Sequence, residues 1–372
     1  MALGTIILTG GVLAISCIFS VRAAGDVMDV TYGGFAFAGN FDSSSKAYPY
    51  SQRFDKGAGE AESAFERIAV GLIKKKSASL QGLRVNFGIA DKSKSPQVLA
   101  LALTEERVLI ERMGEIRKLV IQLGFELLVL NYENKQVVCS LPIFIDLIDA
   151  KKSDFQDNDI VARLKSMVEG SDSQLAEVMN RKLEQLHVRS NNASTLQIIE
   201  VKIGEKAYPF LPKSFRTTPS IYSQAVAQQF GGLLSTRAGV ALLPFSKDAA
   251  NAKMSLRFSA GDDVNFTIPK PTYGIALEVK GFKKVLDKQT EAESVWIYGA
   301  WLDVKVYEPE FGKLYFKSTL KYPVTKLVPA SQNVVDEFPI VSEALKGAII
   351  VAIEAMQNDI VANSKVLSKC KL

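Results

Sequence analysis

Histidine and cysteine are scarce in this chain of 372 residues, which has one histidine and three cysteines. A Ser-His-Asp or Cys-His arrangement would have to use His187, and its neighbours form no nucleophile motif. Zinc sites need several closely spaced His or Cys ligands, and no cysteine pair has CxxC spacing. Loops of the GxGxxG or GxxxxGK[ST] type, which cradle phosphates, do not occur either. We therefore expect no metal and no cofactor.

Dense charge of one sign is also missing. The net charge is +5, and charged residues make up 23% of the chain and apolar ones 47%, which are globular values. Nucleic-acid binding would need lysines and arginines clustered on one surface. The short runs Lys74–Lys76 and Lys283–Lys284 are more typical of solvated ends of elements. We expect no nucleic-acid partner.

Pairs of carboxylates are the remaining catalytic option. They occur at Asp262 and Asp263, at Glu308 and Glu310, and at Asp146 and Asp149. Glycosidase-type chemistry needs two carboxylates that face one cleft, which closeness in sequence does not establish. Polar turns explain all three pairs, so a hydrolase is only a third hypothesis and the chain is not expected to be an enzyme.

The first 24 residues differ from the rest. Residues 1–21 carry no charged side chain, 6–19 form an apolar run, and small residues follow at Ala23 and Ala24. This pattern predicts a secretory signal peptide cleaved after one of these alanines. One alternative is an uncleaved membrane anchor, and only in that case do we expect membrane contact. Another alternative is a lipoprotein that carries its lipid on Cys17.

Removal of the signal would leave Cys139, in an expected strand, and Cys370, almost at the end of the chain. Two cysteines in an exported chain can form one disulfide. Two unpaired thiols are the equal alternative, since sequence does not show whether the Cα atoms approach within bridging distance.

The clearest structural pattern is the stretch 295–322, VWIYGAWLDVKVYEPEFGKLYFKSTLKY. After its Pro/Glu/Gly turn, one face of the strand carries Leu314, Phe316, Ser318, Leu320 and Tyr322, and the other carries Lys313, Tyr315, Lys317, Thr319 and Lys321. A period of two with lysines on the outer side is typical of a half-buried antiparallel hairpin.

A weaker copy of this strand occurs 175 residues earlier (299 minus 124). The segments 124–133 (GFELLVLNYE) and 299–308 (GAWLDVKVYE) share five of ten positions. Two further matches keep the same order: 46–50 with 206–210, and the helical patterns 64–73 with 225–234. Matches in register indicate an internal repeat.

The expected fold class is therefore α+β, with two related modules, each a mainly antiparallel sheet with helices packed on one side. The expected boundaries are a signal peptide at 1–24, a first module at 25–158, a helical connector at 159–194, a second module at 195–360 and a frayed tail at 361–372.

This order of elements resembles the αβ module of the curli-secretion pore protein and the N-terminal domain of the Tol-system protein TolB. The likeness rests on a strand such as 301–307, the acidic turn 308–312 and a final helix such as 338–356. The first copy departs from it, because its turn, 133–136, has no glycine. The resemblance implies a fold and no specific activity.

Two tryptophans, Trp296 and Trp301, lie five residues apart on the opening strand and so point to opposite faces. Burial of both is the simpler interpretation. The alternative is a protein-contact surface of Trp301, Tyr307 and Tyr315.

We thus expect an exported, non-enzymatic envelope protein that binds other envelope proteins or itself. The alternative is a soluble periplasmic carrier whose apolar ligand would lie in a cavity lined by Trp296, Phe282, Phe316 and Leu345.

Overall fold

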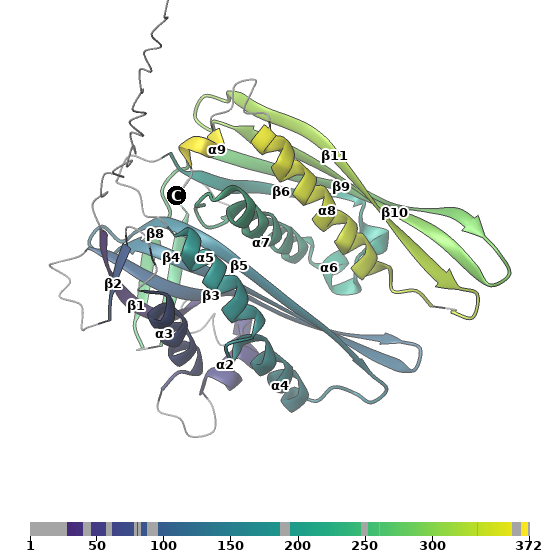
Figure 1. Cartoon of the computed structure of the whole chain (residues 1–372), viewed down its shortest axis with the longest axis horizontal. Coiled ribbons are helices and arrows are strands. Elements are labelled where there is room, and N and C mark those ends of the chain that lie inside the picture. The colour runs from purple at the N-terminus through teal and green to yellow at the C-terminus, as the bar shows by residue number, and fades with distance from the viewer. Residues whose placement is uncertain are drawn as a thin grey trace, which may run out of the picture.

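The computed structural model describes residues 28–39, 46–56, 62–77, 80, 83–87, 96–186, 194–246, 252–259, 261–332, 334–358 and 366–370. The described chain forms two sheets with helices packed on them, which confirms the α+β fold class (Figure 1). The predicted signal peptide and His187 lie outside the described residues. Among the helices of the described ranges, none is long and apolar enough to cross a membrane.

The first sheet has seven strands in the order β2-β1-β3-β4-β5-β8-β7, and it closes on itself because β1 also pairs with β7. Its strands are β1 (Met28–Ala38), β2 (Leu83–Asn86), β3 (Gln97–Met113), β4 (Ile116–Asn131), β5 (Gln136–Lys151), β7 (Lys253–Phe258) and β8 (Asp263–Thr267). The stretch 104–118 belongs to the β3–β4 hairpin.

Strands β7 and β8 come from the second half of the chain yet complete the first sheet. The first module therefore does not end before residue 195, whereas the sequence predicted that it does. Ala36–Ala38 of β1 pair with Leu256–Phe258 of β7, whereas β5 and β8 meet only at Gln136 and Thr267. Inside the closed end, alanines at positions 36, 100 and 102 face larger apolar side chains. Small residues opposite large ones fit the narrow interior of a small barrel.

Helices cover the opposite face of this sheet. They are α2 (Pro49–Lys56), α3 (Ala64–Ser77), α4 (Asp157–Val168) and α5 (Gln174–Gln185). Phe65 of α3 is fully buried and stacks on Phe35 of β1 at 4.7 Å between ring centroids. Leu164 and Leu183, from α4 and α5, are buried in the same core. Residues expected as a connector (159–194) therefore supply the first core as far as residue 186.

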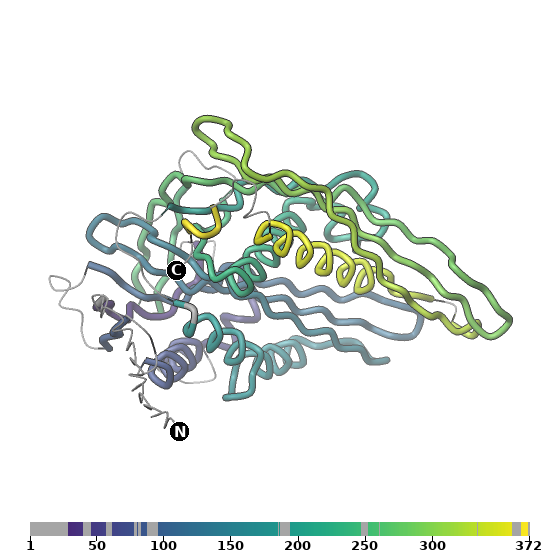
Figure 2. Tube along the Cα trace, turned by 45° about the horizontal axis from the view of Figure 1, so that its top comes forward, coloured from purple at the N-terminus to yellow at the C-terminus, as the bar shows by residue number. Residues whose placement is uncertain are grey.

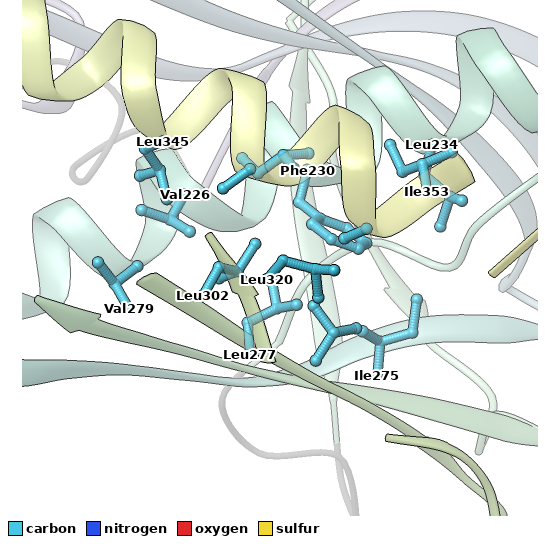
Figure 3. Close-up of a cluster of buried hydrophobic side chains, with 14 of the residues drawn as sticks. Val226, Phe230, Leu234, Ile275, Leu277, Val279, Leu302, Leu320, Leu345 and Ile353 are labelled. Carbon is cyan, nitrogen blue, oxygen red and sulfur yellow. The ribbon is translucent and has the colours of Figure 1, made fainter. Parts of the chain in front are cut away.

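The second sheet has four strands in the order β11-β10-β9-β6. They are β6 (Leu196–Lys206), β9 (Tyr273–Gln289), β10 (Glu293–Tyr307) and β11 (Leu314–Pro329). Its helices are η1 (Tyr208–Phe210), α6 (Lys213–Thr217), α7 (Pro219–Ala238), α8 (Glu337–Asn358) and α9 (Val366–Lys369). In the core, side chains of α7 and α8 such as Phe230 and Leu345 meet strand residues such as Leu277 and Leu302 (Figure 3).

The two halves share the order and the directions of their long strands. In β1-β3-β4-β5 and in β6-β9-β10-β11 the first pair is parallel and the next two pairs are antiparallel. The matched segments 124–133 and 299–308 fall on β4 and β10, which hold the same place in their sheets. The hairpins β3–β4 and β9–β10 extend beyond the helices on the same side of the molecule (Figure 2). An origin by duplication stays a prediction.

Helix α7 lies between the two halves, in contact with β5 of the first and with β6 and α8 of the second. Its Gln228 packs over Gly124 of β4, where a Cβ atom would lie 2.1 Å from the Gln228 amide oxygen. Gln228 also donates to Thr104 at 3.0 Å. Because α7 contacts apolar surface on both sides, it lacks the single apolar stripe of a surface helix.

Further contacts join the halves. The Lys118 ammonium, 4% exposed, lies 2.5 Å from the Asp336 carboxylate. Arg107, paired with Glu105, donates to the carbonyl of Ile221 at 2.9 Å. Removal of one partner of a buried ion pair is strongly destabilising, because it leaves an uncompensated buried charge.

Residues 366–370 lie within the expected frayed tail, and 366–369 of them form helix α9. Val366 and Leu367 of α9 and the following Cys370 are buried in the second core. Apolar side chains inside the expected tail account for this docking, because their burial stabilises the short helix.

Gly347→Ala in α8 is expected to destabilise the protein by about 2 kcal/mol, although alanine is the better helix former. The new Cβ would lie 2.2 Å from the ring of Tyr322 on β11. Urea denaturation would measure the change. The control is Gly71→Ala in α3, where a Cβ meets nothing within 4 Å and a small gain is expected. Equal behaviour of the two variants would contradict the steric explanation, whereas rescue by Tyr322→Ala would support it.

Candidate interaction surface

One face of the second sheet is left uncovered by the described elements. Along β10, Tyr298, Ala300, Leu302, Val304 and Val306 are buried toward α7 and α8, and the residues between them are only partly buried or exposed. Helices lie on the buried side only (Figure 1). We call the side that carries the odd-numbered residues of β10 the β10 outer face.

The centre of the β10 outer face is apolar. Trp301 and Ile297 of β10 are half-buried, and the neighbouring Val285 and Leu327 are 44% and 50% exposed. A Cβ on Gly299 would lie 3.0 Å from the Trp301 ring, so the indole lies across this glycine. An aromatic that covers a strand glycine is held in place by the backbone beneath it.

Lysines surround this centre. In the strand register, Lys321 of β11 lies opposite Trp301, Lys283 of β9 lies opposite Gly299, and Lys305 and Lys317 face each other. These four side chains are exposed. Asp303 on the same face pairs with Lys280 at 3.3 Å. Like charges directly opposite each other repel, so nearby anions would relieve this repulsion.

The structure separates the three aromatic residues of the alternative contact surface, Trp301, Tyr307 and Tyr315. Trp301 and Tyr307 are odd-numbered residues of β10 and lie on the β10 outer face. Tyr315 packs against the second core instead, with its ring 5.3 Å from that of Tyr273, and its hydroxyl donates to Glu308 at 3.2 Å. A register shift between Val306 and Tyr307 at the end of the β10–β11 pair accompanies this change of side.

Sequence reasoning missed the lysines as a group. They come from three strands, and only the cross-strand register shows that they border one tryptophan. The alternation of lysines in 313–321 was the available signal for those on β11.

The carboxylate pairs do not converge on one site. Asp149 accepts from Arg163 at 2.9 Å, which holds the pKa of this carboxyl below its usual range. Asp263 lies 3.4 Å from Arg257, and Glu308 accepts from Tyr315. Among the described residues, no group of three or more His, Cys, Asp or Glu side chains could hold a metal ion.

Of the two alternatives for Cys139 and Cys370, the structure shows two unpaired thiols and no disulfide. Cys139 lies in β5 and packs against the first core, whereas Cys370 follows α9 and is buried in the second. The two residues thus belong to different modules, and a disulfide requires Cα atoms about 4.4–6.8 Å apart. Burial raises the pKa of the Cys139 thiol to about 12, which makes it a poor nucleophile.

The residues expected to line a ligand cavity are part of a filled core. Phe282, Phe316 and Leu345 are buried with the other core side chains, and Trp296 packs against them with the Lys284 ammonium 4.2 Å from its ring centroid. The hollow beside Phe316 has a volume of about 10 Å³. This is room for about one water molecule at most, so the hollow beside Phe316 cannot hold an apolar ligand. Leu345 also lines a larger cleft between the two modules.

Comparisons with known proteins find weak likenesses. No family model matches the chain, and no curated protein matches it. A neuraminyllactose-binding hemagglutinin homolog from Helicobacter pylori is 10% identical, with a TM-score of 0.29, and covers 49% of this chain and 95% of its own. A minor lipoprotein from Acinetobacter baumannii is 12% identical, with a TM-score of 0.22, and covers 46% of this chain and 94% of its own.

A Xanthomonas campestris protein of family DUF330 is 11% identical, with a TM-score of 0.18, and covers 49% of this chain and 93% of its own. Each structure thus spans about half of the chain. What their names describe applies to those proteins alone. The resemblance to the curli pore module and TolB stays a prediction from the sequence.

Proposed function

We propose that this chain is an exported, non-enzymatic protein of the cell envelope that acts in assembly by binding another protein through the β10 outer face. This proposal rests on an uncovered sheet face that has Trp301 at its centre and four exposed lysines around it. An apolar centre with a polar rim is typical of protein interfaces, and tryptophan is enriched at their energetic centres. Export rests on the predicted signal peptide.

The partner is a protein whose contact surface carries acidic groups around an apolar centre. Lysines on the rim would attract such a surface and speed its association. Two copies of this chain would bring the same lysines together face to face, and this repulsion disfavours self-association through the β10 outer face.

The free edge of the sheet is a less suitable contact. Strand β11 is the terminal strand of its sheet, and it carries Pro323, Lys321 and Lys326. Proline and lysine on an edge strand suppress pairing with another chain. The face is therefore the better candidate than the edge.

Photo-crosslinking in cells tests the proposal. A photoreactive phenylalanine analogue in place of Trp301 is expected to give one protein adduct, identified by mass spectrometry. The same analogue in place of Glu177, which is 68% exposed on α5, serves as the control and should not give it. The identified protein should then bind the purified chain in a 1:1 complex that weakens as salt increases.

Charge reversal provides the matched control. Replacing Lys283, Lys305, Lys317 and Lys321 by glutamate is expected to weaken this complex at least about tenfold, since each rim charge acts mainly through attraction of the partner. Lys165→Glu on α4 should leave it unchanged. Adducts with lipid alone, or a complex insensitive to the four reversals, would contradict the proposal.

A further inference from the structure

A second surface feature, separate from the β10 outer face, is a cleft between the two modules. Its volume is about 630 Å³, within the range of roughly 300–1,000 Å³ typical of small-molecule sites. Strands β4 and β5 and helix α5 form one wall, and α6, α7 and α8 form the other. The cleft therefore exists only when both modules are in place.

Much of this cleft is apolar. The first module contributes Val120, Phe144 and Ile148, and the second contributes Phe215 and Leu233. Ile148 is 52% exposed, so its side chain can contact a ligand in the cleft. Apolar side chains on both walls would favour contact with a hydrocarbon chain over contact with water.

A buried lysine lies among these walls. Lys182 of α5 is 1% exposed and lines the cleft. Its ammonium donates to the carbonyl of Gly232 on α7 at 2.9 Å. Within the described part of the chain it forms no ion pair, so a buried cation faces the cleft with one neutral acceptor. Such a charge is unfavourable unless an anion compensates it.

Most of the charged side chains that line the cleft are positive, as Lys182 is. Arg181, Arg237 and Lys346 line it together with Lys182, against the carboxylates of Asp146 and Glu343. Arg181 and Arg237 pair with glutamates outside the cleft lining, Glu177 and Glu354, each at 3.3 Å. Lys182 is thus the cation of this set that is both buried and without an acidic partner in the described chain.

We propose that the inter-module cleft binds an anionic amphiphile with a single hydrocarbon chain. Its carboxylate or phosphate headgroup accepts from Lys182, and its chain lies along Phe144, Ile148 and Leu233. The apolar walls alone would accept an uncharged chain, and the lysine alone would accept a small anion. Together they select a molecule that has both.

The pKa of Lys182 supports this assignment. Burial lowers it to about 7 in the protein without ligand. A bound anion favours the charged ammonium, so binding at pH 8 is coupled to uptake of a proton. The other charged groups that line the cleft are Arg181, Asp146, Arg237, Glu343 and Lys346. After burial, Arg181 is the second cause of the lowered pKa of Lys182.

Titration calorimetry of the full chain with hexadecanoate, below its micelle concentration, tests the proposal. We expect saturable 1:1 binding, and about tenfold weaker binding of hexadecanol, which lacks the charge. Hexadecyl phosphate tests the second headgroup. Acetate and inorganic phosphate, which lack the chain, should show no saturable binding.

Two variants locate the site. Lys182→Met should weaken hexadecanoate about tenfold without changing hexadecanol, and should remove the proton uptake at pH 8. Ile148→Glu should weaken both ligands, because it places a charge on the apolar wall. The control is Ile110→Glu on the β3–β4 hairpin, because Ile110 is 47% exposed and does not line the cleft. This variant should change the affinity for neither ligand.

Equal affinity for the acid and the alcohol would overturn the proposal, as would hexadecanoate binding that survives both Lys182→Met and Ile148→Glu. A complete lack of binding by a folded chain would do the same. Circular dichroism confirms that each variant is folded. Because the β10 outer face is on the other side of the second sheet, these outcomes are independent of the photo-crosslinking result.

Discussion

Lys182→Met is expected to increase the free energy of unfolding by about 4 kcal/mol at pH 5.5, the largest effect foreseen for this protein. Burial lowers the pKa of Lys182 from its ordinary 10.5 to about 7. Below pH 7 the folded protein holds a buried charge that the unfolded chain exposes to water, so this lysine destabilises the fold there. The destabilisation fades as pH rises from 7 to 10.5, and methionine removes it altogether.

Urea denaturation of both proteins at pH 5.5 and at pH 10 gives the comparison. The difference should be large at the lower pH and small at the higher, where the lost hydrogen bond to Gly232 works against the variant. Lys165→Met, at a side chain 59% exposed on α4, is the control and should change stability by less than about 0.5 kcal/mol at either pH. A gain that does not depend on pH would show that packing, and not charge, is responsible.

Glu126→Gln is expected to stabilise the protein by about 3 kcal/mol at pH 8 and to have almost no effect at pH 4. Glu126 on β4 is 6% exposed, and burial raises the pKa of its carboxyl to about 7. A raised pKa means that the folded state disfavours the carboxylate. Glu126 therefore does not reduce the free energy of unfolding below pH 4.5. It reduces the free energy of unfolding as pH rises through 7.

Glu126 accepts a hydrogen bond from the Ser140 hydroxyl at 2.7 Å. Glutamine keeps this interaction, because its amide oxygen can accept from the same hydroxyl. The control is Glu133→Gln in the exposed β4–β5 turn, which should be neutral at both pH values. Denaturation curves at pH 4, 6 and 8 provide the measurement. A destabilised Glu126→Gln at pH 8 would mean that the ionised carboxylate has a favourable partner.

Glu126 and Lys182 change the free energy of unfolding on opposite sides of pH 7. Glu126 lowers stability as pH rises toward 7, and Lys182 restores it above 7. Their combined contribution has a minimum near pH 7. The double variant should lack this minimum, since changes at separate sites add.

Much of the local structure could be predicted from the sequence. Alternation in 295–322 predicted the β10–β11 hairpin, because a strand with one buried face must place apolar side chains at every second position. The matched segments 124–133 and 299–308 fall on strands with the same place in their sheets. Counting along one strand predicted that Trp296 and Trp301 point to opposite faces, but it did not show which of them faces away from the helices.

The tertiary structure decided what depends on pairing between distant segments. Strands β7 and β8 have the same pattern as any short strand, and nothing local shows that they close the first sheet and not the second. The same holds for α4 and α5, whose apolar faces match either a core or a connector. The site residues divide in the same way. Lysine at position 182 looks like any helical surface residue in the sequence, and only the approach of α7 buries it and creates the cleft. A pattern of spacing determines which face of an element is apolar, but contacts between remote elements determine what that face meets and which charges lose water.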